Sequence, residues 1–342
     1  MTGNRPIGPL GKLTLARETV DRATERRTDR AWLDAAWADP ATRVLVVHQG
    51  RALVRLTGGH AELAFIPPAQ APPGVRFLLG VEDERVVYFG VSAPLEGAGV
   101  PLDAPGARPS SPDTRGTGPG RDQPSAHRDG VPRPMSLREA GSMLNDRDAG
   151  LFTHAVALAN WHDTHTHCPI DGTPTVVNPG GHSTTCPADG TEHFPRTDPA
   201  VIMLVTDLQD RCLLARNQAW PQRRVSILAG FVDPGESAEH AVTREVHEET
   251  GITVERVIYL DSQPWPMPRS LMLGFRAEAV GDLAIHVDAD EISEARWYSR
   301  DDLRRALEAR ELALPPAVSI ARRIIEAWYG AELPDGAPFE SR

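Results

Sequence analysis

The sequence predicts an α+β domain at the N-terminal end of the chain and a second domain of strands and helices at the C-terminal end. Three observations predict this division. With 342 residues the chain is long enough for two domains, each with its own core. Runs of helical and of strand-like periodicity occupy both ends of the sequence. Between these ends lie a segment with few aliphatic residues and a short element with two Cys-Pro turns.

The N-terminal α+β domain is predicted over residues 1–98. Residues 18–39, ETVDRATERRTDRAWLDAAWAD, have the pattern of a helix. Apolar and alternating runs follow at 43–56, 61–68 and 74–92, with turn residues between them, and are typical of strands. We therefore expect one helix followed by a set of strands.

Residues 99–135 are predicted to be a flexible insertion. Between Pro101 and Pro134, 13 of 34 residues are proline or glycine, and aliphatic residues are almost absent. Such a segment cannot bury enough surface to offset the entropy lost on ordering it. The sequence assigns it no function.

The overall composition excludes several classes of protein. A formal net charge of -11 argues against a generic nucleic-acid binder. The chain has no apolar run of the length needed to cross a membrane, and its first residues lack the apolar core of a signal peptide. Only three cysteines are present, which argues against a disulfide-built extracellular scaffold. We therefore expect a soluble cytoplasmic protein.

The stretch REVHEETG, at 244–251, belongs to a predicted helix that ends at a glycine. Ser237 can cap the start of this helix, and Gly251 suits the position just past its end. Residues three and four apart share one face of a helix, so Glu245, Glu248 and Glu249 would lie side by side.

This glutamate cluster continues the apolar side of the helix. At about 100° per residue, Ala238, Ala241 and Val242 fall on the same side as Glu245 and Glu249. The polar residues of the opposite side are Glu239, His240, Thr243, His247 and Thr250. Carboxylates directed at the body of a protein repel one another unless a cation or shared protons neutralise them, and a hard divalent ion does so with oxygen ligands. The alternative for a glutamate run is a solvated helix face.

The residues around the helix resemble the Nudix box, whose pattern is Gly, five residues, Glu, seven residues, and then Arg-Glu-apolar-any-Glu-Glu-any-Gly-apolar. The specified positions are filled by Gly230, Glu236, Arg244, Glu245, Val246, Glu248, Glu249, Gly251 and Ile252. The resemblance implies a loop, a helix and a loop against a mixed sheet, in a C-terminal α/β/α Nudix sandwich over residues 196–335. It also implies that the box glutamates hold Mg²⁺ or Mn²⁺ over a diphosphate.

The loop SQPWPMPRS, at 262–270, narrows the substrate. Three prolines in five residues make it stiff, and Trp265 offers a flat surface. It resembles the Ser-Gln-Pro-Trp-Pro-Phe-Pro-x-Ser signature of the NADH pyrophosphatase branch of the Nudix family, with Met267 in place of the phenylalanine. In that branch the loop helps to recognise the nicotinamide nucleotide.

Residues 136–195 are predicted to be a helix followed by a zinc-ribbon-like element. The turns CPIDG and CPADG have the outline of zinc knuckles, with aspartate in place of the second cysteine of each. The element resembles the four-cysteine zinc ribbon of the same branch, and the possible zinc ligands are Cys168, Asp171, Cys186 and Asp189. Histidines that could substitute as ligands are His167, His182 and His193. The alternative is a ribbon whose turns and local core have outlived the metal.

The family resemblance assigns roles to the carboxylates. Glu245 and Glu249 are the expected principal metal ligands, and Glu248 and Glu236 share the metals or orient them through water. Arg244 is expected to position Glu236 and its loop. A further carboxylate is expected from a later loop, where Glu291 has the spacing of the family. The general base is Glu249 or Glu291.

The resemblance also assigns substrate contacts. Phe231 is expected to stack on a substrate base, with Trp265 in the proline-rich loop. Phe194 aligns with an aromatic residue supplied by the partner subunit, which implies a homodimer. The other expected nucleotide contacts are Gln263, Ser270, Met272 and Ala321. For both phenylalanines the alternative is ordinary core packing.

Together these resemblances imply a metal-dependent NAD(H) diphosphatase, which hydrolyses its substrate to nicotinamide mononucleotide and AMP. They also imply removal of NAD caps from the 5′ ends of RNA. A first alternative is a Nudix hydrolase of another substrate, such as ADP-ribose or a dinucleoside polyphosphate. A second is an inert nucleotide-binding regulator, which the intact set of box glutamates disfavours.

Overall fold

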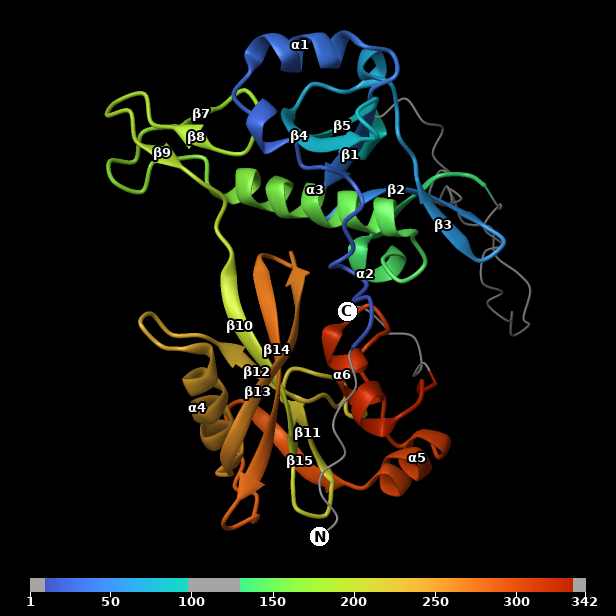
Figure 1. The fold of residues 1–342 in the computed structure, drawn as a ribbon, viewed down its shortest axis with the longest axis vertical. Coiled ribbons are helices and arrows are strands. Elements are labelled where there is room, and N and C mark those ends of the chain that lie inside the picture. Colours follow the sequence, from blue (N-terminus) through green and yellow to red (C-terminus); the bar gives the residue numbers. More distant parts are fainter. Residues whose placement is uncertain (1–9, 98–129, 335–342) are drawn as a thin grey trace, which may run out of the picture. The chain divides into compact units, whose positions relative to one another are not determined.

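The computed structural model describes residues 10–97 and 130–334, which form two compact units (Figure 1). One unit runs from Val20 to His193, and the other joins the residues up to Thr19 to those from Phe194 onward. The segment before Val20 therefore groups with the C-terminal unit, and the ribbon groups with the N-terminal one, unlike the predicted boundaries. Most of the predicted insertion at 99–135 lies outside the described residues, but its end contributes to a strand, Arg133–Ser136.

The N-terminal unit is built on a six-stranded sheet in the order β3-β2-β1-β5-β4, with β6 paired to β2. Strands β1 and β5 are parallel, and the other pairs are antiparallel. The predicted α+β class is therefore confirmed. The strands are β1 (Arg43–His48), β2 (Arg51–Thr57), β3 (His60–Leu63), β4 (Val75–Glu82), β5 (Val86–Ser92) and β6 (Arg133–Ser136).

Helices cover both faces of this sheet. Val44 and Val46 of β1 pack in one core with Leu33 of α1 (Arg30–Ala38). Leu45 and Val47, which alternate with them, are buried on the opposite face, where α3 (Asp146–Thr164) lies along the sheet. A short helix, α2 (Leu137–Ala140), precedes α3.

The helix predicted over 18–39 forms only in its second half. Asp21 exchanges backbone hydrogen bonds with Val81 of β4, at 3.1 and 2.7 Å, so this part of the chain is extended. A single 3₁₀ turn, η1 (Thr24–Arg26), follows, and Asp29 then caps α1 by accepting from the backbone N–H of Trp32 at 3.0 Å. Pairing with the sheet and capping by Asp29 override the helical pattern of the first residues.

The C-terminal unit has a mixed sheet in the order β13-β14-β10-β11-β15, with β12 paired to β10. Strands β10 and β14 are parallel over nine residue pairs, and all the other pairs are antiparallel. The strands are β10 (Asp198–Thr206), β11 (Cys212–Asn217), β12 (Leu228–Phe231), β13 (Thr253–Trp265), β14 (Ser270–Val280) and β15 (Ile292–Tyr298). The helices are α4 (Ala238–Thr250), α5 (Arg300–Glu308) and α6 (Ile320–Tyr329).

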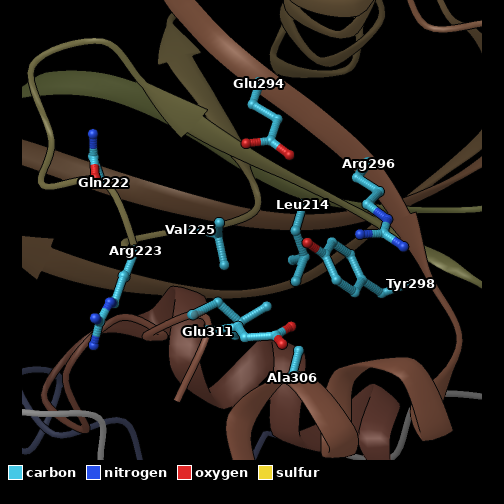
Figure 2. Close-up of a pocket in the computed structure, with 10 residues that line it drawn as sticks. Leu214, Gln222, Arg223, Val225, Glu294, Arg296, Tyr298, Ala306 and Glu311 are labelled. Atoms are coloured by element: carbon cyan, nitrogen blue, oxygen red, sulfur yellow. The ribbon is translucent and has the colours of Figure 1, made fainter. Parts of the chain in front are cut away.

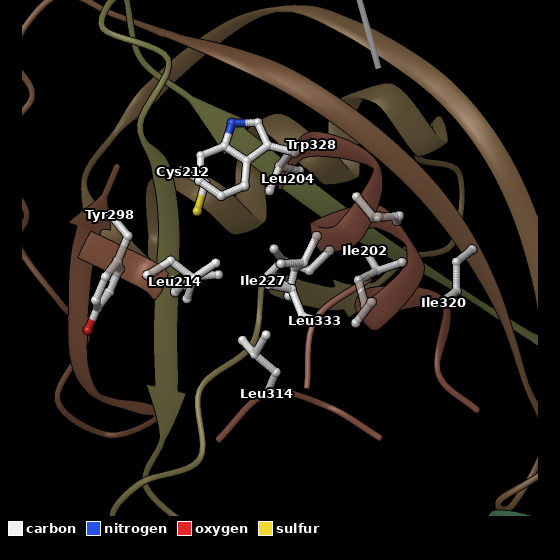
Figure 3. Close-up of a cluster of buried hydrophobic side chains, with 14 of the residues drawn as sticks. Ile202, Leu204, Cys212, Leu214, Ile227, Tyr298, Leu314, Ile320, Trp328 and Leu333 are labelled. Carbon is white, nitrogen blue, oxygen red and sulfur yellow. The ribbon is translucent and has the colours of Figure 1, made fainter. Parts of the chain in front are cut away.

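Two cores on opposite faces of the mixed sheet confirm the predicted α/β/α sandwich. Val201 and Met203 of β10 pack with α4, whereas Ile202 and Leu204 pack with α5 and α6 (Figure 3). Leu10 and Leu13 belong to the second of these cores, which explains why the first described residues group with this unit. None of the helices among the described residues has the length and apolarity needed to span a membrane.

The ribbon is a small three-stranded sheet in the order β7-β8-β9. Its strands have two residues each, Val176–Val177, Thr184–Thr185 and Glu192–His193. So few ladder hydrogen bonds contribute little to the stability of the ribbon.

Candidate active site

Helix α4 begins and ends where the sequence predicts. The hydroxyl of Ser237 accepts from the backbone N–H of His240 at 3.2 Å, and Gly251 takes the left-handed conformation with φ of 71°. The prediction that Thr250 lies on the polar side is wrong, because this residue is fully buried. Its hydroxyl donates to the carbonyl of Val246 at 2.6 Å, and the segment around His286 hydrogen-bonds to the last turn of the helix and covers it.

Glu245 lies directly against strand β12. A Cβ added at Gly230 would stand 1.8 Å from Cδ of Glu245, so only glycine allows the carboxylate to occupy this place. The first glycine of the box is therefore required by close approach and not by backbone conformation.

Arg244 ties the loop to the helix. Its Nε and Nη2 donate to the two carboxylate oxygens of Glu236, each at 2.9 Å, in a bidentate ion pair. Its Nη1 donates at 2.9 Å to Glu245 and to Glu248, and Nη2 also donates at 2.9 Å to the carbonyl of Phe231. One guanidinium thus fixes three box glutamates and the end of β12.

The pKa values of two box glutamates move in opposite directions. Hydrogen bonds from Arg244, and one from the backbone of Asp233, lower the pKa of Glu236 to about 2. Burial, together with the nearby charges of Glu245, Glu291 and Glu248, raises the pKa of Glu249 to about 8. Glu236 is consequently ionised at neutral pH, whereas Glu249 favours its protonated form in the absence of a cation.

Arg244 contributes one positive charge to this group of carboxylates, which is too little to neutralise all of them. Burial also raises the pKa of Glu245, although Arg244 opposes that shift. Glu249 is only 7% exposed, and its Oε2 has no hydrogen-bond partner among the residues that the structure describes. A buried acceptor without a partner, surrounded by carboxylates, is a suitable place for a hard divalent cation.

The structure brings Glu291 to this cluster. It lies in the loop before β15, where its backbone N–H donates to Asp288 and its carbonyl accepts from Gln218 at 2.9 Å. Its carboxylate is near enough to influence the pKa of both Glu245 and Glu249. Glu245, Glu248 and Glu291 are thus close enough to Glu249 to act on its pKa, and Glu236 is joined to Glu245 and Glu248 through Arg244.

Phe231, predicted to stack on a substrate base, and Phe194, predicted to be supplied to a partner subunit, are both at the surface. Phe231 is 59% exposed at the end of β12, and Phe194 is 65% exposed. Ordinary core packing, the alternative for both, is therefore excluded for this chain. Their exposure leaves one face of each ring available to a ligand or to another protein chain.

The other predicted nucleotide contacts lie on or near the β13–β14 hairpin. Trp265 pairs with Ser270, and Gln263 pairs with Met272. Gln263 is fully buried; its Nε2 donates to the carbonyl of Val318 at 3.0 Å, and its Oε1 has no partner among the described residues. Ala321, at 2% exposure, lies in the core that Met272 packs against, so its side chain faces the protein interior.

An ion-pair cluster at the start of β10 is not among the site residues predicted from the sequence. Asp198 accepts from Nε of Arg196 at 2.5 Å and from Nε of Arg269 at 2.7 Å. Arg269 belongs to the proline-rich loop, and Asp198 pairs with Ser270 in the sheet. The position of Arg269 next to Ser270 was the only sequence signal that could have drawn attention to it.

The two knuckles of the ribbon have the same geometry. In each, the N–H of a left-handed glycine, Gly172 or Gly190, donates to the cysteine carbonyl at 2.9 Å. The four side chains predicted as zinc ligands place one donor atom each within 4.8 Å of one another, and they are Cys168, Asp171, Cys186 and Asp189. The residues therefore fit a tetrahedral zinc ion, with two sulfur and two oxygen donors.

The histidines predicted as substitute ligands are not part of this group. Among the described residues, the clustered donors include neither His167 nor His193, and His182 is engaged elsewhere, with its Nε2 2.7 Å from the carbonyl oxygen of Leu78. Hydrogen bonds from the backbone of Thr173 and Thr191 lower the pKa of Asp171 and of Asp189, so both carboxylates are ionised and able to ligate.

A separate depression of about 180 Å³ opens on the α5 side of the sheet (Figure 2). None of the site residues predicted from the sequence lines it. Its floor is continuous with the core of this unit, and its lining residues are Leu214, Gln222, Arg223, Val225, Glu294, Arg296, Tyr298, Ala306, Glu311 and Leu312. It is therefore distinct from the carboxylate cluster, which lies on the α4 side.

Comparison with known families assigns each part of the chain. Residues 196–319 match the NUDIX domain, residues 163–194 the NADH pyrophosphatase zinc ribbon domain, and residues 41–161 the NADH pyrophosphatase-like rudimentary NUDIX domain. The sequence patterns do not indicate that the N-terminal domain is itself Nudix-like. The match explains its mixed sheet between helices.

Two relatives illustrate the similarity. The chain is 41% identical over 333 residues to the NAD-capped RNA hydrolase NudC of Mycobacterium tuberculosis (strain H37Rv), covering 93% of this chain and 95% of that protein. It is 41% identical over 207 residues to the mitochondrial NAD(P)H pyrophosphatase NUDT13 of Mus musculus, covering 57% of this chain and 58% of that protein.

Proposed function

This chain belongs to the NADH pyrophosphatase group of the Nudix hydrolases, and from that premise we propose that it hydrolyses the diphosphate of NAD(H). Water attacks one phosphorus atom, the bridging P–O bond breaks, and the products are nicotinamide mononucleotide and AMP. For NADH the first product is the reduced mononucleotide. The observation that carries the proposal is the buried, unpartnered oxygen of Glu249, whose pKa is raised by burial and by the nearby charges of Glu245, Glu248 and Glu291.

We propose Glu245, Glu249 and Glu291 as the residues that hold Mg²⁺ or Mn²⁺, with Glu248 and Glu236 beside them. When bound, such an ion neutralises the non-bridging phosphate oxygens and lowers the pKa of water. Arg244 orients these carboxylates, because it donates hydrogen bonds to both carboxylate oxygens of Glu236 and to one of Glu245.

Two carboxylates are candidates for the general base. Oε2 of Glu249 is buried and has no hydrogen-bond partner among the described residues, which leaves it available to accept a proton from water. Glu291 is exposed and lies beside it. Either residue takes the proton that the attacking water loses, and the site releases it with the products.

Phe231 and Trp265 are the proposed base-recognising residues. Both lie where strands of the same sheet end, Phe231 on β12 and Trp265 on β13. We further propose that Phe194 completes the site of a second copy of the chain in a homodimer, which accounts for its exposure of 65%. Analytical ultracentrifugation of the wild type and of Phe194→Ala tests whether a dimer forms. Turnover of NADH by the two proteins tests whether activity depends on this ring.

NAD-capped RNA is the second proposed substrate. Its cap carries the same diphosphate as NAD, and the Mycobacterium tuberculosis relative with 41% identity is named for that activity.

We also propose that the ribbon binds one structural zinc through Cys168, Asp171, Cys186 and Asp189, because their donor atoms converge. A cytoplasmic location is our proposal as well, since both substrates occur there.

Product analysis on a panel of substrates tests the proposed function. The wild type is incubated with NADH, NAD, ADP-ribose and NAD-capped RNA in the presence of Mg²⁺ or Mn²⁺, and Glu249→Gln serves as the control for contaminating activity. We expect AMP with the reduced mononucleotide from NADH. Preferential hydrolysis of ADP-ribose would favour another Nudix activity. Binding without hydrolysis of any of the four would favour a regulator.

A further inference from the structure

Asp198 links two arginines at the start of strand β10. Its two carboxylate oxygens accept separately, one from Nε of Arg196 and the other from Nε of Arg269. Burial would raise the pKa of Asp198, but the hydrogen bonds from both arginines outweigh burial and hold that pKa below its ordinary value. The carboxylate therefore stays ionised, and the three side chains carry a net charge of about +1 at neutral pH.

This cluster lies beside the proline-rich loop of residues 262–270, to which Arg269 belongs. Asp198 pairs with Ser270 of β14, and Ser270 pairs with Trp265 of β13. On the other side of β10, the backbone N–H of Val232, next to Phe231, donates to the carbonyl of Pro199 at 3.1 Å. Neighbouring strands lie about 4.8 Å apart, so the backbone of Asp198 is about 10 Å from that of Trp265, two strands away.

Both guanidiniums retain unused donors. Each guanidinium uses only its Nε to donate a hydrogen bond to Asp198. Neither makes another side-chain hydrogen bond or ion pair among the described residues. The side chain of Arg196 is 62% exposed and that of Arg269 is 36% exposed. Their terminal nitrogens are therefore accessible to an anion, and paired arginines match the geometry of phosphate oxygens.

A structural role in joining β10 to β14 does not explain why two arginines contact Asp198. Strands β10 and β14 are already joined by nine paired residues, and a single arginine would suffice to pair with Asp198. The second arginine leaves an excess positive charge on a chain whose formal net charge is -11. Such a charge beside a nucleotide loop is expected to attract a phosphate.

We propose that Arg196 and Arg269, held by Asp198, form a subsite for an additional phosphate carried on the ribose of the substrate. This inference rests on the proposed function, since it assumes that a dinucleotide occupies the loop. Two substrates carry such a group: a dinucleotide with a ribose 2′-phosphate, and a NAD-capped RNA, whose 3′-phosphodiester joins the cap to the next nucleotide. The cluster would raise affinity for these substrates relative to unphosphorylated NAD(H).

Binding of three adenosine nucleotides to the full chain tests the subsite without requiring turnover. Calorimetry compares AMP with adenosine 2′,5′-bisphosphate and adenosine 3′,5′-bisphosphate in the presence of Mg²⁺. We expect at least one bisphosphate to bind about 10- to 100-fold more tightly than AMP, as for a phosphate that gains charged hydrogen bonds. A gain with the 2′-phosphate indicates the dinucleotide, and a gain with the 3′-phosphate indicates RNA.

Arg269→Gln and Arg196→Gln should each abolish most of this gain while leaving the Kd of AMP nearly unchanged. The matched control is Arg256→Gln, since Arg256 is an exposed arginine on β13 that pairs with Glu278 at 3.3 Å, and it should keep the full gain. Equal affinity of the wild type for all three nucleotides would overturn the subsite. An unchanged gain in both variants would do the same. The proposed function fails separately, through the absence of products from NADH.

Discussion

The guanidinium of Arg244 donates two hydrogen bonds of 2.9 Å to the carboxylate of Glu236. These residues lie eight positions apart, one in the loop before α4 and one in the middle of the helix. The same guanidinium reaches Glu245, Glu248 and the carbonyl of Phe231. The relationship couples the metal-binding face of the helix to the end of β12, where a substrate base is expected to stack.

Arg244→Lys should lower kcat/KM for NADH about 10- to 100-fold, because lysine cannot form a bidentate pair or reach several acceptors at once. The fold should persist, since the helix caps and the core contacts of α4 do not involve this side chain. Steady-state kinetics with circular dichroism check both statements. Arg256→Lys, at an exposed ion pair on β13, is the control and should be nearly silent.

Gly230→Ala should remove most activity by displacing Glu245. The added Cβ would meet Cδ of Glu245 at 1.8 Å, so either the carboxylate or strand β12 must shift. We expect a loss of at least about 100-fold in kcat, with destabilisation of about 1–3 kcal/mol. Gly235→Ala is the control, because no atom lies within 4 Å of a Cβ there and only its φ of +87° opposes the change. Equal losses in the two variants would contradict the close-approach explanation.

The metal-free protein should lose stability as pH rises. Glu249 has a folded pKa of about 8 against an ordinary value of 4.5, so between these values the folded state binds more protons than the unfolded state. Stability from this group is fully present below about pH 4.5 and is lost as pH passes through about 8.

Thermal unfolding with a chelator, from about pH 5 to about pH 8.5, measures this loss. The Tm of the wild type should fall relative to that of Glu249→Gln over this range, and excess Mg²⁺ should reduce the difference. Parallel Tm curves for the two proteins would show that Glu249 has no raised pKa in the folded state.

Elemental analysis should find about one zinc per chain, since four donor atoms converge in the ribbon. Cys168→Ser should lose this metal and lower the Tm, because the ribbon has strands of only two residues. Cys212→Ala is the control: Cys212 is fully buried in the core of the C-terminal unit and should leave the zinc in place. A wild-type protein with full activity and no zinc would support a ribbon that has outlived its metal.

The sequence predicts local features well where short-range chemistry decides them. The limits of α4 follow from the cap by Ser237 and from the left-handed Gly251, and the paired knuckles follow from their glycine turns. The two-domain plan and the mixed sheet also agree with the sequence prediction. For the helix limits and the knuckles, the determining residues lie within a few positions of the groups that they contact.

Long-range packing accounts for what the sequence does not reveal. Asp21 pairs with Val81, which breaks the expected helix, and Leu10 packs into a core built mainly from residues beyond 200. The ion pair between Asp198 and Arg269 joins residues 71 positions apart, and only the register of β10 and β14 brings them together. Periodicity in a single sequence carries no information about such pairings.

We propose that the face of α4 bearing Glu249 is catalytic. Turnover of NADH by Glu249→Gln, compared with Glu239→Gln, tests it most directly, because Glu239 is an exposed glutamate on the opposite side of the same helix. We predict a loss of roughly 10²- to 10⁴-fold in kcat for Glu249→Gln, with NADH binding retained, and near-normal turnover for Glu239→Gln. Equal losses in the two variants, or near-normal turnover in Glu249→Gln, would contradict the account.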